Sequence, residues 1–178
     1  MIDFQTRARA IELVIFDVDG VMTDGSLYLG DDGQEYKAFN ARDGHGMTML
    51  RQAGIAMAVI TGRCSEVVRI RMESLRVEYV YQGQRDKGPA YAALRAACGL
   101  EHDQIAYVGD DVVDVPVMRQ VGLAVAVADA HPLVKAHCHW QTCLPGGRGA
   151  VREVCEGLLA AQGKLDALLN GYLARLDE

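Results

Sequence analysis

The stretch Leu13–Gly25, LVIFDVDGVMTDG, decides the fold of this chain. Four apolar residues, Leu13–Phe16, lead directly into Asp17 and Asp19, and a glycine follows the second aspartate. A short apolar run of this kind is typical of a strand that is buried on both faces of a parallel sheet. The sequence therefore predicts a buried strand over residues 13–18 that carries two carboxylates at its carboxyl end.

Length and composition predict a single globular domain over residues 1–178. Half of the residues are hydrophobic and 24% are charged, which is ordinary for a chain that builds one core. The net charge of -6 argues against nucleic acid as a partner, because nucleic acid requires a basic face. No apolar run approaches the roughly 20 residues that span a bilayer, so we expect no membrane insertion. Scattered cysteines without a CxxC pair and a polar N-terminal segment predict a cytoplasmic protein.

Short apolar runs alternate with helix-like segments along the chain. The predicted buried strands cover residues 13–18, 55–60, 78–83, 104–110 and 123–128. Glycines, a serine and a proline mark helix ends, and the predicted helices cover residues 44–54, 65–75, 87–99, 112–122 and 149–165. This alternation predicts an α/β fold, a Rossmann-like doubly wound parallel sheet with helices on both faces. The last helix and the tail after it form a C-terminal segment over about residues 149–178.

One segment breaks the alternation, directly after the paired aspartates. Residues 26–40, SLYLGDDGQEYKAFN, contain an Asp-Gly turn between two strand-like stretches, which predicts a β-hairpin. A lone hairpin is marginally stable in water, so its apolar side chains need a surface that covers them. These side chains are Leu27, Leu29, Tyr36 and Phe39.

Polar residues of particular types follow several of the predicted strands. In a doubly wound sheet, ligands bind beyond the carboxyl ends of the strands. The residues at these ends are Asp17, Asp19, Thr61, Lys87, Asp110, Asp111 and Asp114. We expect them to converge on one crevice.

This group of side chains can bind a metal ion and a phosphoryl group. Clustered carboxylates raise one another's pKa unless a cation lies among them, and hard oxygen ligands suit Mg²⁺. A magnesium site beside a lysine and a threonine hydroxyl can hold a phosphoryl group and spread its charge. Asp17 can then attack phosphorus as a covalent nucleophile. Asp19, close to the leaving oxygen, can act first as general acid and then as general base for water.

The motifs DVDGVMTD, ITGR, Lys87 and GDDVVD together resemble the four motifs of the haloacid dehalogenase superfamily of phosphohydrolases. The resemblance spans Asp17 to Asp114 and implies the haloacid dehalogenase fold, with Asp17 as nucleophile and Asp19 as acid and base. It implies Mg²⁺ bound by Asp17, the backbone carbonyl of Asp19, and Asp110. It further implies that Thr61 and Lys87 hold the phosphoryl group, while Asp111 and Asp114 support the metal or the lysine from behind.

The gaps between these motifs leave no room for the cap domain that most such phosphatases carry. Between Asp19 and Thr61 lie only the hairpin, one helix and one strand, and between Thr61 and Lys87 only one helix and one strand. A site without a cap is open to water, so either a macromolecular substrate or a neighbouring subunit must cover it. The apolar hairpin favours a neighbouring subunit, since oligomer contacts would bury it.

The connecting segments resemble one group of capless sugar-acid phosphatases within the superfamily. The matching segments cover about residues 10–170 and include FNARDGHGM, YQGQRDKG, GLAVAVADAHP and GGRGAVREVCEGLLAAQGKLD. The resemblance implies hydrolysis of the 8-phosphate of an eight-carbon sugar acid, on the route to the inner core of lipopolysaccharide. It also implies a homotetramer in which the hairpins form a central barrel. Two alternatives stay open: a phosphatase for a nine-carbon acid such as a nonulosonate 9-phosphate, and a non-catalytic assembly module of the same fold.

The same resemblance implies substrate contacts for a further set of residues. They are Asp19, Asn40, Ala41, Arg42, Asp43, Gly44, Thr48, Arg63, Arg71 and Lys87. Arg63 and Arg71, placed on the helix after the second motif, would together with Lys87 pair the phosphate and the sugar carboxylate, where the bidentate geometry of arginine helps. Arg71 is equally consistent with a solvent-facing helix residue, and Thr48 departs from a family pattern in which a longer basic residue can occur. The glycine-rich segment 145–150 either carries Arg148 to a neighbour's active site or is a simple loop before the last helix.

Overall fold

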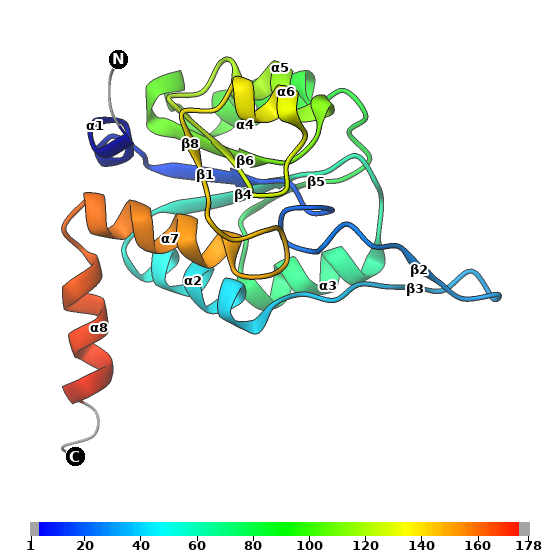
Figure 1. Cartoon of the computed structure of the whole chain (residues 1–178), viewed down its shortest axis with the longest axis horizontal. Coiled ribbons are helices and arrows are strands. Elements are labelled where there is room, and N and C mark those ends of the chain that lie inside the picture. The colour runs from blue at the N-terminus through cyan, green and yellow to red at the C-terminus, as the bar shows by residue number, and fades with distance from the viewer. Residues whose placement is uncertain (1–3, 175–178) are drawn as a thin grey trace.

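Figure 1 shows the computed structural model of the chain, which describes residues 4–174. Within these residues one six-stranded sheet has the order β5-β4-β1-β6-β7-β8, and every neighbouring pair of its strands is parallel. The strands are β1 (Leu13–Phe16), β4 (Ala56–Ile60), β5 (Tyr79–Tyr81), β6 (Ile105–Gly109), β7 (Leu123–Ala126) and β8 (Trp140–Gln141). The predicted parallel sheet is confirmed, and β8 is an edge strand that the sequence pattern did not predict.

The order of the strands reverses at β1, the strand that ends in the paired aspartates. From β1 the chain builds β4 and β5 on one side, and it then crosses back to build β6 and β7 on the other. Phe16, the last residue of β1, pairs with Val59 of β4 and with Val108 of β6. In open α/β sheets, ligands bind at such a reversal, beyond the carboxyl ends of the strands. The topology therefore places Asp17 at the ligand-binding position of the sheet.

Helices cover both faces of the sheet, with α4, α5 and α6 on one face and α2, α3 and α7 on the other (Figure 1). The helices are α1 (Phe4–Arg9), α2 (Ala41–Gln52), α3 (Glu66–Leu75), α4 (Gly88–Cys98), α5 (Val115–Met118), α6 (Pro132–Ala136), α7 (Ala150–Ala161) and α8 (Leu165–Leu173), with short 3-10 turns η1 (His102–Gln104) and η2 (Val112–Asp114). Of these, α1, α6, α8 and η1 were not predicted. No helix in the described part of the chain is both long enough and apolar enough to cross a bilayer.

Three of the predicted helices differ from those observed. The helix predicted over residues 112–122 is the short turn η2 followed by α5, which already ends at Met118. Helix α2 begins at Ala41, three residues earlier than expected, because Asn40 caps it and its side chain accepts a hydrogen bond from the Arg42 amide at 2.9 Å. The helix predicted over residues 149–165 ends at Ala161, and the separate helix α8 begins at Leu165. Gly163, with φ of 67°, makes the turn between them. The end of the predicted C-terminal tail, residues 175–178, lies outside the described residues.

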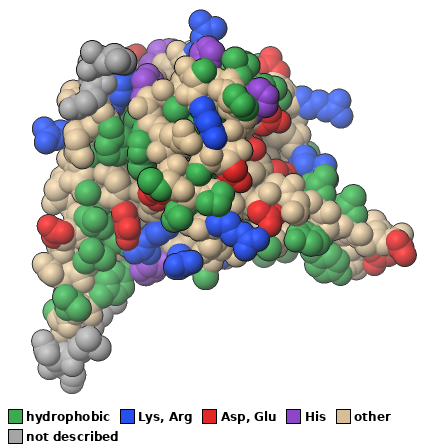
Figure 2. All heavy atoms as spheres, in the orientation of Figure 1, with side chains coloured by type: hydrophobic (Ala, Val, Ile, Leu, Met, Phe, Trp, Pro, Cys, Tyr) green, Lys and Arg blue, Asp and Glu red, His purple; other side chains and the backbone are tan. Residues whose placement is uncertain are grey.

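The predicted hairpin is present as an arm that projects from the body of the molecule (Figure 1). Its strands β2 (Tyr28–Leu29) and β3 (Glu35–Tyr36) pair antiparallel. Apolar side chains gather along this arm (Figure 2), and the four exposed ones are Leu27, Tyr28, Leu29 and Tyr36. Phe39 was also expected to need a covering surface, and it finds one within its own chain, where it is half-buried against the core beneath the guanidinium of Arg71. By residue 39 the chain has already rejoined the body.

Candidate active site

The ladder between β1 and β6 continues through Asp17. The Asp17 amide donates to the Val108 carbonyl at 3.0 Å, and its carboxylate accepts from the Val18 amide at 2.7 Å. The chain then turns at Gly20, which has φ of 90°. A Cβ at that position would lie 2.0 Å from Asp110 Oδ2, so only glycine lets this loop approach the end of β6. The local sequence thus brings the ends of the two central strands into contact.

Three carboxylates from these two strand ends gather at one point. Asp17, Asp110 and Asp114 each offer an oxygen, and these oxygens lie within 4.8 Å of one another. Asp110 Oδ1 is buried and has no hydrogen-bond partner among residues 4–174. A buried acceptor without a partner, inside a cluster of hard oxygen ligands, is what a bound divalent cation would satisfy. The residues present therefore fit Mg²⁺.

Lys87, the residue before α4, extends its ammonium group into this cluster. Its Nζ lies 3.0 Å from Asp17 Oδ2 and 2.6 Å from Asp114 Oδ1, and the whole residue is 2% exposed. This geometry places Lys87 next to Asp17, the first of the paired aspartates. A long cationic side chain is almost never this buried unless it is paired, so the lysine and the carboxylates are mutually dependent.

Tyr107 of β6 completes the buried network, and the sequence analysis missed it. Its hydroxyl accepts from Lys87 Nζ at 3.1 Å and donates to Asp114 Oδ1 at 2.7 Å. Asp114 Oδ2 accepts from the amides of Asp110 and Asp111 at 3.0 and 3.2 Å. Both oxygens of Asp114 are therefore engaged, in agreement with a supporting role. A signal for Tyr107 was available, because a tyrosine within a fully buried strand needs a partner for its hydroxyl.

The electrostatics of the cluster follow from three carboxylates that share one ammonium group. Burial raises the pKa of Asp17 to about 7, with help from the charge of Asp114 and against the pull of Lys87. Burial, then the charges of Asp17 and Asp114, raise the pKa of Asp110 to about 8. For Lys87, burial acts to lower the pKa, but the charges of Asp17 and Asp114 raise it above its ordinary value. The site thus carries an excess of negative charge that a divalent cation would neutralise.

Asp19 and Thr61 border the same pocket, which has a volume of about 270 Å³. Its lining residues are Asp17, Asp19, Thr61, Gly62, Arg63, Lys87, Asp110, Asp111 and Val113. Thr61 directly follows β4 and is buried, and its amide donates to the Tyr81 carbonyl at 2.9 Å. Asp19 is paired with Lys37 of the hairpin segment and lies 3.9 Å from Arg63, Oδ2 to Nε. The predicted catalytic residues therefore meet in one crevice.

Arg63 lines this pocket, but it does so from a loop. It was predicted to lie on the helix after the second motif, and that placement was wrong because α3 begins only at Glu66. Ser65 takes the N-cap position as expected, without a side-chain hydrogen bond to the helix. The loop leaves the side chain of Arg63 46% exposed at the rim of the pocket.

The other predicted substrate contacts lie at the start of α2 and on α3, and they do not line the catalytic pocket of their own chain. Asp43 is 2% exposed, and its Oδ1 accepts from the Arg152 amide at 2.8 Å. Gly44 lies against Arg71, since a Cβ there would be 2.2 Å from Arg71 Nη2. Thr48 donates to the Gly44 carbonyl at 3.1 Å. Substrate contact by these residues, and by Asn40, Ala41 and Arg42, stays a prediction.

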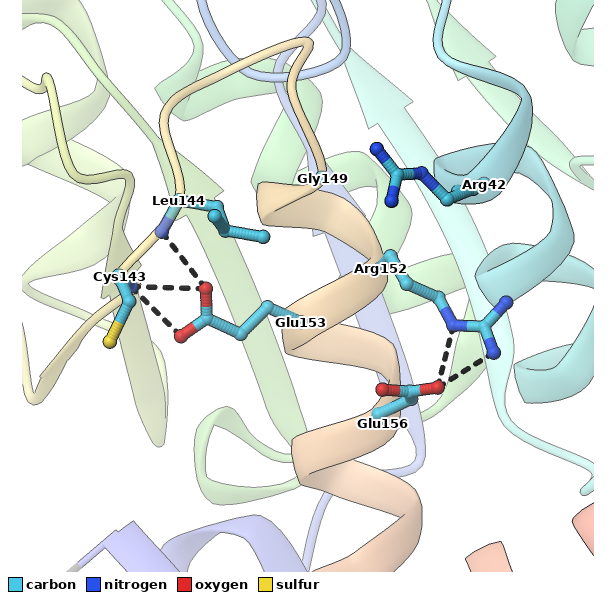
Figure 3. A pocket seen from close by; sticks show the side chains of 7 residues that line it. All are labelled: Arg42, Cys143, Leu144, Gly149, Arg152, Glu153 and Glu156. Carbon is cyan, nitrogen blue, oxygen red and sulfur yellow. Dashed lines mark hydrogen bonds and ion pairs between the residues drawn. The ribbon is translucent and has the colours of Figure 1, made fainter.

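Arg42 faces a second pocket of about 330 Å³, between α2 and the start of α7 (Figure 3). On α7, Arg152 pairs with Glu156 at 2.6 Å. Glu153 accepts hydrogen bonds from the amides of Cys143 and Leu144, at 2.8 to 3.0 Å. The carboxylates here are occupied by their own neighbours, so Arg42 is the lining cation that points across open space (Figure 3).

The glycine-rich loop over residues 145–150 packs on the loop after Asp19. The Gly147 amide donates to the Val21 carbonyl at 2.9 Å, and Arg148 Nη2 lies 3.4 Å from Asp24 Oδ2. A Cβ at Gly146 would lie 1.7 Å from the carbonyl oxygen of Gly20. The loop therefore supports the backbone that carries the paired aspartates, whatever Arg148 contacts outside the chain.

Two comparisons with known proteins decide the family. The profile of the haloacid dehalogenase-like hydrolases matches residues 60–145. A 3-deoxy-D-manno-octulosonate 8-phosphate phosphatase from Yersinia pestis is 52% identical over 164 residues, which is 92% of this chain and 88% of that protein. The chain belongs to the 3-deoxy-D-manno-octulosonate 8-phosphate phosphatase family.

Solved structures of this phosphatase family share the whole fold. The Moraxella catarrhalis phosphatase, in complex with magnesium, phosphate and 3-deoxy-D-manno-octulosonate (KDO), superposes with a TM-score of 0.93 at 39% identity and covers 94% of this chain and 97% of its own. The cobalt-bound Haemophilus influenzae phosphatase has a TM-score of 0.90 at 39% identity, covering 94% and 99%. The capless haloacid dehalogenase fold that the motifs implied is confirmed.

Proposed function

We propose that this chain hydrolyses 3-deoxy-D-manno-octulosonate 8-phosphate to the free sugar acid and phosphate, as a step in the biosynthesis of the lipopolysaccharide inner core. The observation that carries the proposal is the convergence of Asp17, Asp110 and Lys87 in one pocket. The 52% identity with a phosphatase of this substrate supports the choice of sugar. Intact catalytic side chains that line one pocket argue against a non-catalytic assembly module.

Magnesium is part of the proposal. The carboxylates of Asp17 and Asp110 and the backbone carbonyl of Asp19 would hold the ion, with Asp111 and Asp114 as supports. The unpartnered Asp110 oxygen and the excess negative charge support this assignment. When bound, the ion neutralises phosphate charge and polarises the phosphoryl group.

The residues of the chain divide the reaction between them. A carboxylate oxygen of Asp17 attacks phosphorus as the bond from phosphorus to the sugar oxygen breaks, and Asp19 donates a proton to that oxygen. The result is an aspartyl phosphate on Asp17 and the free sugar acid. Asp19 then takes a proton from water, which attacks phosphorus and releases Asp17. Lys87 and Thr61 hold the phosphoryl oxygens throughout, where fixed donors stabilise developing charge.

Assembly into a homotetramer would complete the site. The exposed apolar side chains of the hairpin support this part of the proposal, because contiguous apolar surface of this kind marks an interface. A neighbouring subunit would cover the open pocket and could bring the predicted substrate contacts of α2 and α3, such as Arg42 and Arg71, to it. A cytoplasmic location belongs to the same proposal and is supported by the five free thiols.

A turnover screen across phosphorylated sugar acids tests the function. Phosphate release is measured with Mg²⁺ for 3-deoxy-D-manno-octulosonate 8-phosphate, for a nonulosonate 9-phosphate and for p-nitrophenyl phosphate. We expect the highest kcat/KM on the eight-carbon acid, and Asp17→Asn serves as the background. A clear preference for the nine-carbon acid would replace the proposed substrate. Equal background from the wild type and Asp17→Asn on all three would favour an assembly module.

A further inference from the structure

Asp19 belongs to a closed ring of four charged side chains, of which two come from the hairpin segment. We call this the charge ring; it consists of Asp19, Glu35, Lys37 and Arg63. Lys37 Nζ forms an ion pair with Asp19 Oδ1 and lies 3.4 Å from Glu35 Oε1. Arg63 Nη2 lies 3.1 Å from the same Glu35 oxygen, and Arg63 Nε lies 3.9 Å from Asp19 Oδ2. Two cations and two carboxylates therefore alternate around the ring, and their charges sum to zero.

Lys37 is the most buried member of the charge ring. Its side chain is 1% exposed, against 20% for Asp19, 16% for Glu35 and 46% for Arg63. A buried ammonium group requires partners of opposite charge, and its ion-pair partners in the described chain are Asp19 and Glu35. Lys37 does not line the catalytic pocket, whereas Asp19 and Arg63 do. Lys37 therefore contacts one pocket-lining residue, Asp19, directly, and it reaches the other, Arg63, only through Glu35.

The alternation of strand β3 explains how a protruding arm delivers these charges. Successive side chains of a strand point to opposite faces, so Glu35 and Lys37 share one face while Tyr36 takes the other. Tyr36 is exposed on the apolar surface of the arm. The same short strand thus presents an apolar face outward and a charged face toward the catalytic pocket.

We propose that Lys37 is a positioning residue for proton transfer: its ammonium group holds the carboxylate of Asp19 at the edge of the pocket, where the leaving oxygen is released. Glu35 holds the side chains of Lys37 and Arg63 in place, so the hairpin supports Asp19, the acid and base of its own chain. This inference rests on the proposed role of Asp19 in phosphate ester hydrolysis, and it is independent of which sugar acid the chain prefers.

The dependence of the rate on the leaving group distinguishes a role in proton transfer from a general loss of active-site structure. A general acid contributes more to the rate when the leaving group is more basic. We therefore measure kcat/KM with saturating Mg²⁺ on two esters, phenyl phosphate and p-nitrophenyl phosphate. The p-nitrophenolate released from the second is less basic than the phenolate released from the first. In Lys37→Met we expect kcat/KM on phenyl phosphate to fall about tenfold further than on p-nitrophenyl phosphate, which is part of the roughly 10²–10⁴-fold that a general acid contributes. Lys37→Arg, which keeps the charge, should restore part of the ratio.

Lys164→Met is the matched control. Lys164 is also partly buried, and its Nζ donates to Ala53 O and Gln162 Oε1, away from the site. We expect both rates to stay at the wild-type level in this variant. Equal losses on the two esters in Lys37→Met, or no loss, would overturn the inference.

A second variant covers the case in which Lys37→Met does not fold, as judged by its thermal melt. Glu35→Gln keeps Lys37 and Asp19 but removes the second partner of both cations. It should shift the ratio of the two rates in the same direction by a smaller factor, and an unchanged ratio in Glu35→Gln would then overturn the inference. If the wild type turned over aryl phosphates but no sugar-acid phosphate, the proposed substrate would fail while the test of Lys37 would stand.

Discussion

Lys87 Nζ lies 2.6 Å from Asp114 Oδ1, and the two side chains are 1% and 0% exposed. The same ammonium group lies 3.0 Å from Asp17 Oδ2. The ammonium group of Lys87 is therefore shared between Asp17, the proposed nucleophile, and Asp114. Because all three groups are shielded from water, the loss of any one leaves the others uncompensated.

Replacing Lys87 should destabilise the protein as well as inactivate it. Lys87→Met leaves Asp17 and Asp114 buried without their cation, which should cost about 3–5 kcal/mol of unfolding free energy. The double variant Lys87→Met/Asp114→Asn should lose less unfolding free energy than the two single variants lose in sum, because each single change already breaks the pair. Urea unfolding without metal measures all four proteins of the cycle. Strict additivity would contradict a direct interaction between Lys87 and Asp114.

The paired aspartates should each be needed for turnover. Asp17→Asn removes the nucleophile and Asp19→Asn removes the acid and base, so each should lower kcat at least about 100-fold. Phosphate release from the sugar acid phosphate measures the loss. Asp166→Asn on α8 is the matched control and should keep full activity. Retained activity in either site variant would refute its assigned role.

Magnesium binding should strengthen as the pH rises from 6 to 8.5. The pKa values of about 7 for Asp17 and about 8 for Asp110 mean that both carboxyl groups hold protons at pH 6, and Mg²⁺ must displace them. For each proton that must be displaced, the affinity for Mg²⁺ should fall up to about tenfold with every unit that the pH is lowered. Thermal melts with Mg²⁺ and with EDTA should show a larger rise in Tm at pH 8.5, and EDTA should abolish turnover.

The metal-free protein should respond to pH in the opposite direction. The folded-state pKa of each carboxyl lies above the unfolded value of about 3.8, so the folded state binds more protons across that window. Stability should therefore decline between about pH 4 and pH 7–8, and this contribution should level off above. A Mg²⁺-induced rise in Tm that is equal at pH 6 and pH 8.5 would contradict the assignment of both carboxyls to the metal site.

The hairpin should hold the oligomer together. Light scattering should report about four chains for the wild type. Leu29→Asp places a charge at a side chain that is 65% exposed in the single chain and should shift the protein to monomers with lower activity on the sugar acid phosphate. Leu133→Asp changes a leucine on α6 that is 45% exposed and should leave assembly intact. A wild-type monomer with full activity would refute the proposal that a neighbour covers the site.

The glycine-rich loop should be sensitive to a single methyl group. Gly146→Ala would bring its Cβ within 1.7 Å of the Gly20 carbonyl oxygen, so the loop that carries Asp19 must move. We expect a loss of about 1–3 kcal/mol of stability together with a lower kcat. Gly171→Ala on α8 meets no atom within 4 Å and should be neutral or stabilising. Unchanged kcat in Gly146→Ala would show that the loop does not support the site.

Much of the site could be predicted from the sequence because its residues lie in short segments with clear strand, turn or helix signals. The apolar run before Asp17 and the glycine after Asp19 specify a buried strand and a tight turn through their own backbone preferences. Lys87 and Thr61 were predictable for the same reason, since each directly follows a strand or begins a helix. The start of α2 was misplaced because the cap of Asn40 extends a helix past glycines that weaken the pattern.

What the sequence by itself determined is the chemistry at the strand ends, because parallel strands necessarily present their carboxyl ends at one edge of a sheet. Only the tertiary structure decided which other side chains reach that edge. Tyr107 lies within an apolar run and Lys37 within the hairpin segment, and no local motif marks either one. Their roles depend on contacts 7 and 18 residues apart in the chain, and such contacts are selected by the burial of charge and hydroxyl groups that must find partners, which no local pattern encodes.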